Sequence, residues 1–184
     1  MRLIATAVLL VAGMIGSAPS GWCGSPDQGW KEIGVRGGIS ATSKREYFHQ
    51  YEVYADYGLP WSLRAASGWG VATQLGAAVG ALHGGGETGV IGSLGPRLVL
   101  DRAGKGVAFN LGGDVCILSR HRFGTADFNG DPLFQGHVGV TYRFENGLGV
   151  SYRFQHMSNG GLGLNGGGNP GLDLHMLGLS LNIQ

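Results

Sequence analysis

The chain has 184 residues and 43% apolar content, a size and composition that suit one folded domain. Thirteen basic and twelve acidic residues leave a formal charge of +1, which excludes the strong basic excess typical of nucleic-acid-binding proteins. Glycine reaches 37 residues, far above its usual share of about 7%, without the three-residue period of collagen. Glycine in such abundance within alternating sequence favours a curved β-sheet.

The N-terminus has the pattern of an export signal. Arg2 precedes an apolar run over 3–15, and Gly16-Ser17-Ala18 has the small-x-small form of a cleavage site. We therefore expect a signal peptide over 1–18, with cleavage as late as residue 24 as an alternative, and one β-barrel domain over 19–184. A buried N-terminal helix is the competing interpretation. The two cysteines, Cys23 and Cys116, are too few for a disulfide framework, and their pairing is left open.

Alternation with period two dominates the rest of the chain and predicts strands. Over 31–40, Ile33, Val35 and Ile39 share one face while Arg36 and Ser40 share the other. Breaks in this alternation predict about eight strands: 30–40, 47–57, 62–81, 89–100, 106–118, 135–144, 148–158 and 172–183.

The predicted connections alternate in length along the chain. Short turns are expected at 58–61, 101–105 and 145–147, and longer loops at 41–46, 82–88, 119–134 and 159–171. Short turns at one end and long loops at the other are typical of outer-membrane barrels. The predicted fold is all-β, an eight-stranded antiparallel transmembrane up-and-down β-barrel.

A soluble lipocalin-like barrel is the main alternative, because both kinds of barrel alternate. The export signal favours the membrane barrel over the soluble one. So do four polar residues of the alternating strands, which are more cheaply placed in a hydrogen-bonded interior than against lipid: Arg36, Asn110, Asp114 and Arg143. Aromatic residues near strand ends also fit interfacial girdles: Tyr47, Tyr57, Trp61, Tyr142 and Phe144.

Three polar residues interrupt an apolar outward face near the C-terminus. His156 and Ser158 continue the lipid-facing parity of Tyr152 and Phe154, and Asp173 shares the outward parity of the last predicted strand. A serine, a histidine and a carboxylate in reach of one another are the parts of an activated nucleophile. The alternative is that these three residues are noncatalytic polar residues at the membrane interface.

The residues around these positions sharpen the hypothesis. His156-Met157-Ser158-Asn159, followed by Asn169-Pro170-Gly171-Leu172-Asp173, resembles the active-site segment of the PagL-type lipid A 3-O-deacylases of the Gram-negative outer membrane. The resemblance covers the last two strands and their loop in specific residues, and the remainder only in strand layout. It implies a barrel with an outward-facing Ser-His-acid site.

By position, the resemblance implies that His156 is the general base, Ser158 the nucleophile and Asp173 the orienting acid. It also implies an oxyanion hole from Asn169 and the backbone N–H of Gly161, supported by Asn159. Two features depart from the family: aspartate stands at 173 where glutamate is common, and the chain ends at Gln184 rather than at an aromatic residue.

The activity implied is that of a carboxylic ester hydrolase that removes the 3-hydroxyacyl chain at position 3 of lipid A. Its partners would be lipid A or lipopolysaccharide and membrane lipid in the outer leaflet, and a homodimer is left open. The alternative is a noncatalytic outer-membrane barrel with a structural or binding role.

No cofactor and no metal are expected. The G-x-G-x-x-G pattern at 161–166 lacks the βαβ unit that dinucleotide binding needs, and the histidines lack the spacing of metal ligands. Four loop cations are read as solvated charges, with lipid A phosphates as the alternative partner: Lys44, Arg45, Arg120 and Arg122.

Overall fold

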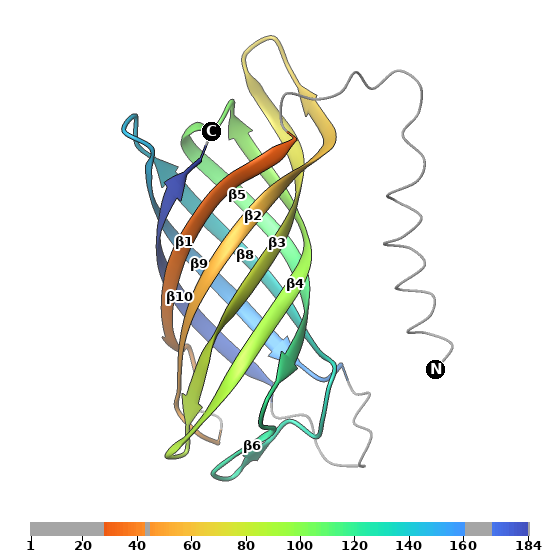
Figure 1. Cartoon of the computed structure of the whole chain (residues 1–184), viewed down its shortest axis with the longest axis vertical. Helices are drawn as coiled ribbons and strands as arrows, with labels where there is room; N and C mark the ends of the chain where they lie inside the picture. The colour runs from red at the N-terminus through yellow and green to blue at the C-terminus, as the bar shows by residue number, and fades with distance from the viewer. Residues whose placement is uncertain (1–27, 43–44, 161–170, 184) are drawn as a thin grey trace, which may run out of the picture.

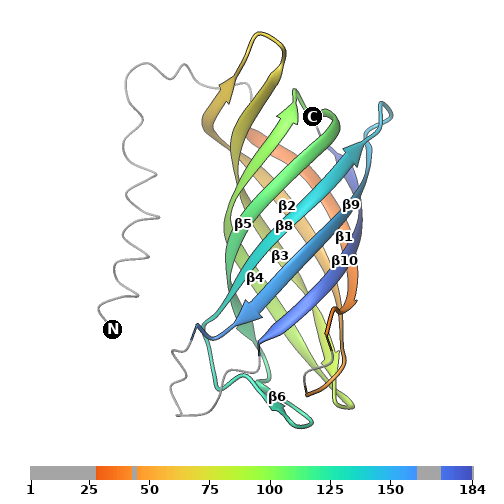
Figure 2. The ribbon, with the colours of Figure 1, turned by 180° about the vertical axis from the view of Figure 1, so that it is seen from behind.

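The computed structural model describes residues 28–42, 45–160 and 171–183, and it forms a closed antiparallel barrel (Figures 1 and 2). The strands are β1 (Gly29–Ser40), β2 (Phe48–Arg64), β3 (Trp69–Gly84), β4 (Glu87–Arg102), β5 (Lys105–Leu118), β8 (Leu133–Arg143), β9 (Leu148–Ser158) and β10 (Leu172–Asn182). Each strand pairs with its neighbour in the chain, and β1 pairs with β10 to close the sheet. The eight-stranded up-and-down barrel is thus confirmed.

A small hairpin, β6 (Arg122–Phe123) and β7 (Ala126–Asp127), lies within the longest described loop, at the bottom of Figure 1. All the long connections lie at that end, which we call the loop end, together with the short β3–β4 turn, and the other end, the turn end, carries only short connections. None of the described residues belongs to a helix long and apolar enough to span a membrane. The predicted export signal and Cys23 lie outside the described residues, whereas Cys116 is a buried free thiol.

Six of the eight predicted strands agree with the structure to within two residues at both ends. The prediction was wrong for the hairpin between β2 and β3, because the chain does not turn at 58–61. β2 runs on through Pro60 to Arg64, and the turn lies at 65–68. Gly68 closes it with a φ of 85°, and its N–H donates to the carbonyl of Ala65 at 2.9 Å.

Pro60 is tolerated within β2 because it lies where the ladder is interrupted. The β2–β3 register shifts between Gly58 and Ser62, and β1 begins at Gly29, opposite Gly58. A proline there removes no ladder hydrogen bond, as at a sheet edge. The predicted loop at 82–88 is also wrong: it shrinks to Gly85 and Gly86, whose positive φ values of 56° and 78° make a tight two-residue hairpin turn.

The outer wall of the barrel is apolar along its length. Exposed side chains include Val35 at 53%, Phe109 at 51%, Leu111 at 55% and Leu177 at 67%. Aromatic rings gather near the turn end, where Trp30 meets Tyr57 and Tyr142 meets Phe144 at centroid distances of 5.5 and 4.9 Å. A lipocalin-like barrel would bury these faces, so the soluble alternative is excluded.

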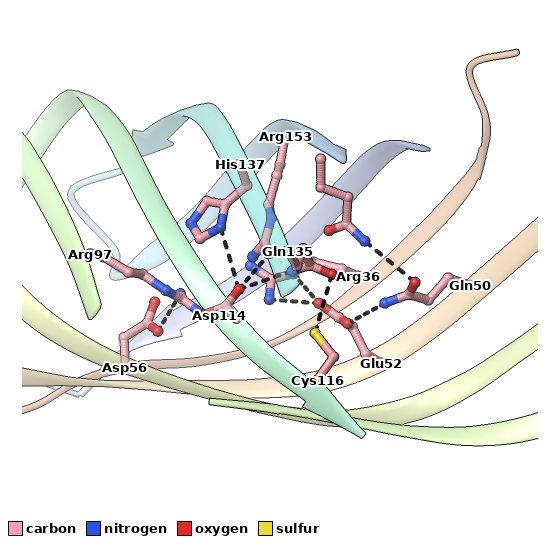
Figure 3. Close-up of polar contacts among 11 residues, drawn as sticks. Arg36, Gln50, Glu52, Asp56, Arg97, Asp114, Cys116, Gln135, His137 and Arg153 are labelled. Carbon is pink, nitrogen blue, oxygen red and sulfur yellow. Dashed lines mark hydrogen bonds and ion pairs between the residues drawn. The ribbon is translucent and has the colours of Figure 1, made fainter. Parts of the chain in front are cut away.

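The middle of the barrel is filled by a network of paired charges (Figure 3). Arg36 binds Glu52 at 2.6 Å, and Arg97 pairs with Asp56. Asp114 accepts hydrogen bonds from Gln135 at 2.9 Å and Arg153 at 3.2 Å. Buried charges need such partners because isolated ones cost several kcal/mol each.

At the loop end the interior changes from polar to apolar. Here the buried side chains form one apolar cluster: Phe48, Leu82, Ile91, Cys116, Leu118, Phe123, Ala126, Phe128, Leu133, Met157, Leu172, Leu174 and Met176. Phe48, Phe123 and Phe128 pack ring against ring at 5.6–6.1 Å. Met157 of β9 and Leu172 of β10 belong to this cluster, so the loop ends of both strands are packed against it.

Candidate active site

Parity along β9 and β10 determines which side chains leave the barrel at the loop end. In β9, Arg153, Gln155 and Met157 are buried inside, whereas Tyr152 and His156 are exposed outside. In β10, Leu172 and Leu174 point inward, so Asp173 between them points outward. The outward direction predicted for His156, Ser158 and Asp173 is therefore confirmed.

Register then brings His156 and Asp173 together. The two residues stand directly opposite each other in the β9–β10 ladder. His156 Nδ1 lies 2.6 Å from Asp173 Oδ1. Because an ionised carboxylate only accepts hydrogen bonds, this contact requires the proton on Nδ1, and the tautomer with its proton there has its lone pair on Nε2, the atom that can act as a base. Asp173 is one methylene shorter than the glutamate that is common at this position in the family it resembles, and its carboxylate still contacts the imidazole.

Asp173 is held from the other side by β1. The ladder continues past Ser40, where the backbone N–H of Ala41 donates to the Asp173 carbonyl at 2.8 Å. The next residue, Thr42, donates its hydroxyl to Asp173 Oδ2 at 3.4 Å. Thr42 was missed by the sequence reasoning because only barrel closure between β1 and β10 brings it to the site.

The side chains of His156 and Asp173 differ in access. That of His156 is 50% exposed and that of Asp173 only 16%. An accessible imidazole backed by a sheltered carboxylate suits a base that must meet a substrate on the outer surface.

Ser158 stands at the last position of β9, on the same face as His156. Its Oγ accepts a 3.4 Å hydrogen bond from the backbone N–H of Gly160. Within the described part of the chain, no hydrogen bond joins Ser158 to His156. Two residues along a strand span about 6.6 Å, a separation at which a change of the Ser158 rotamer can direct Oγ toward the imidazole while His156 keeps its contact with Asp173.

The other predicted site residues divide into two groups. Asn159 is buried, and its side-chain amide donates to the Phe128 carbonyl at 3.3 Å, which ties the end of β9 to the long loop. Gly161 and Asn169 lie outside the described residues.

The loop cations do not converge on these residues in the described structure. Arg120 pairs with Glu87 and lowers the pKa of that carboxyl group through a hydrogen bond. Arg122 binds Asp127 at 3.0 Å, while Arg45 is exposed and Lys44 lies outside the described residues. Paired charges fit the interpretation of solvated loop residues better than that of phosphate ligands. Among the described residues, no group of three or more metal-binding side chains occurs.

Comparison with known proteins places the fold and the family. A family model described as lipid A 3-O-deacylase (PagL) matches residues 49–182, more than two thirds of the chain. The crystal structure of the outer membrane enzyme PagL is similar, with a TM-score of 0.67 and 23% identity, over 82% of this chain and 99% of that one. The crystal structure of Neisserial surface protein A (NspA) aligns with a TM-score of 0.47 and 11% identity, over 84% and 96%.

No curated protein matches the sequence. The family match spans every strand but β1, including the segment that carries His156, Ser158 and Asp173. The closed barrel with its apolar outer wall agrees with the fold of the outer membrane enzyme PagL. The chain belongs to the lipid A 3-O-deacylase (PagL) family of outer-membrane β-barrels.

Proposed function

We propose that this barrel is a serine esterase that removes the 3-hydroxyacyl chain esterified at position 3 of lipid A. The observation that carries the proposal is the 2.6 Å contact between His156 Nδ1 and Asp173 Oδ1 on the outward face, with Ser158 on the same face of β9. Family membership supports lipid A as the substrate class.

The reaction proceeds through an acyl-enzyme. Ser158 Oγ attacks the ester carbonyl while His156 Nε2 takes its proton, and Asp173 stabilises the resulting imidazolium. His156 then returns the proton to the departing sugar oxygen, which becomes a hydroxyl. A water molecule attacks the acyl-serine with His156 again as base, and the fatty acid leaves as Ser158 recovers its proton.

The oxyanion that forms at the carbonyl needs hydrogen-bond donors. We assign this role to the Gly161 backbone N–H and the Asn169 side chain, in line with the family's pattern, with Asn159 in support. Asn159 contributes by anchoring the start of this segment, because its amide binds the Phe128 carbonyl. Loss of one oxyanion donor typically lowers the rate by about 10²–10³-fold.

The substrate approaches sideways through the outer leaflet. The proposed site lies at the loop end of the outer wall, and from there the wall continues toward the middle of the barrel through Phe154 and Tyr152 of β9 and Leu177 of β10. The barrel interior beneath it is filled by the apolar cluster, so a lipid has no route through the lumen. An ester at the headgroup boundary meets Ser158 while its acyl chains stay in the bilayer.

The competing function is a noncatalytic barrel that stabilises the membrane or binds a partner. The esterase needs the Ser158 hydroxyl for its reaction, whereas the noncatalytic barrel does not. Mass spectrometry of lipid A from membranes that contain the wild-type protein should show loss of one 3-hydroxyacyl group, and Ser158→Ala should abolish that loss. Ser151→Ala is the matched control, because Ser151 lies on the same strand but faces the interior.

Equal abundance and folding of all three proteins are established before the lipid is compared. Unchanged lipid A in the wild-type sample, across several lipid A acylation patterns, would overturn the esterase and favour the noncatalytic barrel. Deacylation that persists in Ser158→Ala would instead remove Ser158 from the mechanism.

A further inference from the structure

A pair of histidines lies on the outer wall at the loop end, apart from the proposed catalytic residues. His49 of β2 stands directly opposite His83 of β3 in the ladder, and the centroids of the two rings are 6.5 Å apart. Both imidazoles point outward, because their chain neighbours Phe48 and Leu82 are buried inside the barrel. Each histidine is one residue from the loop end of its strand, close to the β3–β4 turn at the bottom of Figure 1.

Register creates this pair, and the sequence did not reveal it. His83 was predicted to lie in a loop at 82–88, but the tight turn at Gly85 and Gly86 lets β3 continue past it. The absence of a metal was expected from the spacing of the histidines along the chain. That spacing says nothing about residues that face each other across two strands.

The ring of His83 is oriented by a hydroxyl group on the next strand. Thr88 of β4 stands opposite His83, and its Oγ1 lies 2.8 Å from His83 Nδ1. When Thr88 accepts this hydrogen bond, Nδ1 carries the proton and Nε2 keeps its lone pair. Neither Nε2 of His83 nor a ring nitrogen of His49 forms a hydrogen bond with another described residue. A histidine whose other nitrogen is bound by a neighbouring group in this way is typical of metal ligands.

The separation of the two rings fits one shared metal ion. A metal–nitrogen bond of about 2.0–2.1 Å places each ring centre about 3 Å from the ion, so the centres of two ligating imidazoles lie up to about 6 Å apart. The observed 6.5 Å needs only a small rotation of the two side chains. Neutral imidazole suits zinc, copper and nickel, whereas magnesium and calcium prefer carboxylate and carbonyl oxygens, which this pair does not offer.

The pair lies where the apolar wall meets the loops. Toward the middle of the barrel the same strands expose Val53, Val79 and Val90. An ion on the two histidines would therefore sit at the headgroup boundary, with its other positions open to water or to phosphate oxygens of lipid. β1 and β10 separate β2 from β9, so the pair is three strand steps, about 14 Å along the wall, from the strand that carries His156.

We propose that His49 and His83 bind a divalent transition-metal ion, with Thr88 as a positioning residue. The ion is held by His83 Nε2 and one ring nitrogen of His49, and water or a lipid phosphate oxygen completes its coordination. The site is separate from the proposed esterase. Hydrolysis needs neither histidine, so the inference is tested independently of the proposed function.

Copper(II) is the probe, because an imidazole site binds it more tightly than the other divalent first-row metals. Its electron paramagnetic resonance spectrum also reports the number of coordinated nitrogens. The protein without an affinity tag, in neutral detergent micelles, is titrated with copper. The wild type should bind one copper ion whose spectrum shows two imidazole nitrogens.

His49→Gln and His83→Gln should each remove this spectrum, and the double variant should lose no more than either single one, since one imidazole alone cannot chelate. Thr88→Val keeps both ligands but removes the orienting hydrogen bond, and should weaken copper binding about tenfold. His121→Gln is the matched control, because His121 lies in the long loop beside Asp131 and its loss should leave the two-nitrogen spectrum intact. Circular dichroism establishes that every variant is folded.

A wild-type spectrum without two imidazole nitrogens would overturn the proposal. So would a two-nitrogen spectrum that survives in both single variants, because the copper would then lie elsewhere, for instance on His156. Binding of inorganic phosphate by the wild type in place of copper would overturn it in favour of an anion site. Lipid A hydrolysis should be unchanged in His49→Gln and His83→Gln, and its loss would contradict the separation of the two sites.

Discussion

Asp173 stands opposite His156 in the β9–β10 ladder, and the contact between Oδ1 and Nδ1 is 2.6 Å. The pair depends on register rather than on side-chain length, since a slip of one residue would turn either group into the barrel. Backbone pairing on both sides of β10 prevents that slip, because β1 continues its ladder to Ala41.

Asp173→Asn should lower kcat by about 10²–10⁴-fold while the barrel stays folded. An amide can donate to Nδ1 and so favours the wrong tautomer of the imidazole, as in serine proteases. Asp173→Glu keeps the charge and should retain more activity than Asp173→Asn. Rates of lipid A deacylation by the wild type and both variants at equal abundance test this order. A higher rate for Asp173→Asn than for Asp173→Glu would show that the carboxylate charge is not needed for the reaction.

Thr42→Val should lower kcat by less than about tenfold. The substitution removes the 3.4 Å hydrogen bond to Asp173 Oδ2 and leaves the contact with His156 in place. A single neutral hydrogen bond contributes about 0.5–1.5 kcal/mol. Thr42→Ser, which keeps the hydroxyl, is the matched control, and equal losses in both variants would assign the effect to loop packing instead.

Gly136→Leu should impair lipid A hydrolysis without unfolding the barrel. Gly136 pairs with His156 from the β8 side, is exposed on the outer wall, and has no atom within 4 Å of the place where a Cβ would stand. A leucine therefore fits the fold but occupies space beside the imidazole. The expected result is a raised KM for lipid A, with an unchanged unfolding midpoint in urea; full activity would show that substrate does not pass over β8.

Asp56→Ala should destabilise the barrel by about 3–5 kcal/mol. The change leaves Arg97 as a buried charge without its ion-pair partner in the middle of the lumen. Replacing both residues together, as Asp56→Leu with Arg97→Met, should cost less than the single change. Urea unfolding followed by tryptophan fluorescence in lipid vesicles compares them, and additive losses would contradict the coupling.

Acid should weaken the contact between the β1–β2 loop, which carries Glu46, and the β5–β8 loop, which carries Thr125. Glu46 accepts hydrogen bonds from the Thr125 backbone N–H at 2.8 Å and from its hydroxyl at 2.8 Å, and the backbone bond is the main cause of a lowered Glu46 pKa. A lowered folded-state pKa means that the contact stabilises fully above the ordinary value of 4.5 and is lost as pH falls through the folded value. Hydrogen exchange of the Thr125 amide should accelerate over that window, relative to the intrinsic rate. Glu46→Gln should remove the pH dependence.

The sequence by itself determined the class of fold and the faces of its strands. Period-two alternation is a local property, so it correctly assigns Ile33 and Val35 to the outer wall and Arg36 to the interior. The same parity correctly places His156, Ser158 and Asp173 outside the barrel. A resemblance confined to two strands and a loop was enough to indicate the family.

Turn positions and contacts between distant strands needed the tertiary structure. Pro60 looked like a turn residue, yet it is tolerated within β2 because β1 does not extend far enough to require a backbone hydrogen-bond donor at that position. The apolar cluster at the loop end, the contact of Thr42 with Asp173 and the stacking of Tyr152 on His175 all depend on register and closure. Alternation tells which face a side chain takes, but not which residue of another strand lies beside it, because every shift of two residues preserves the pattern.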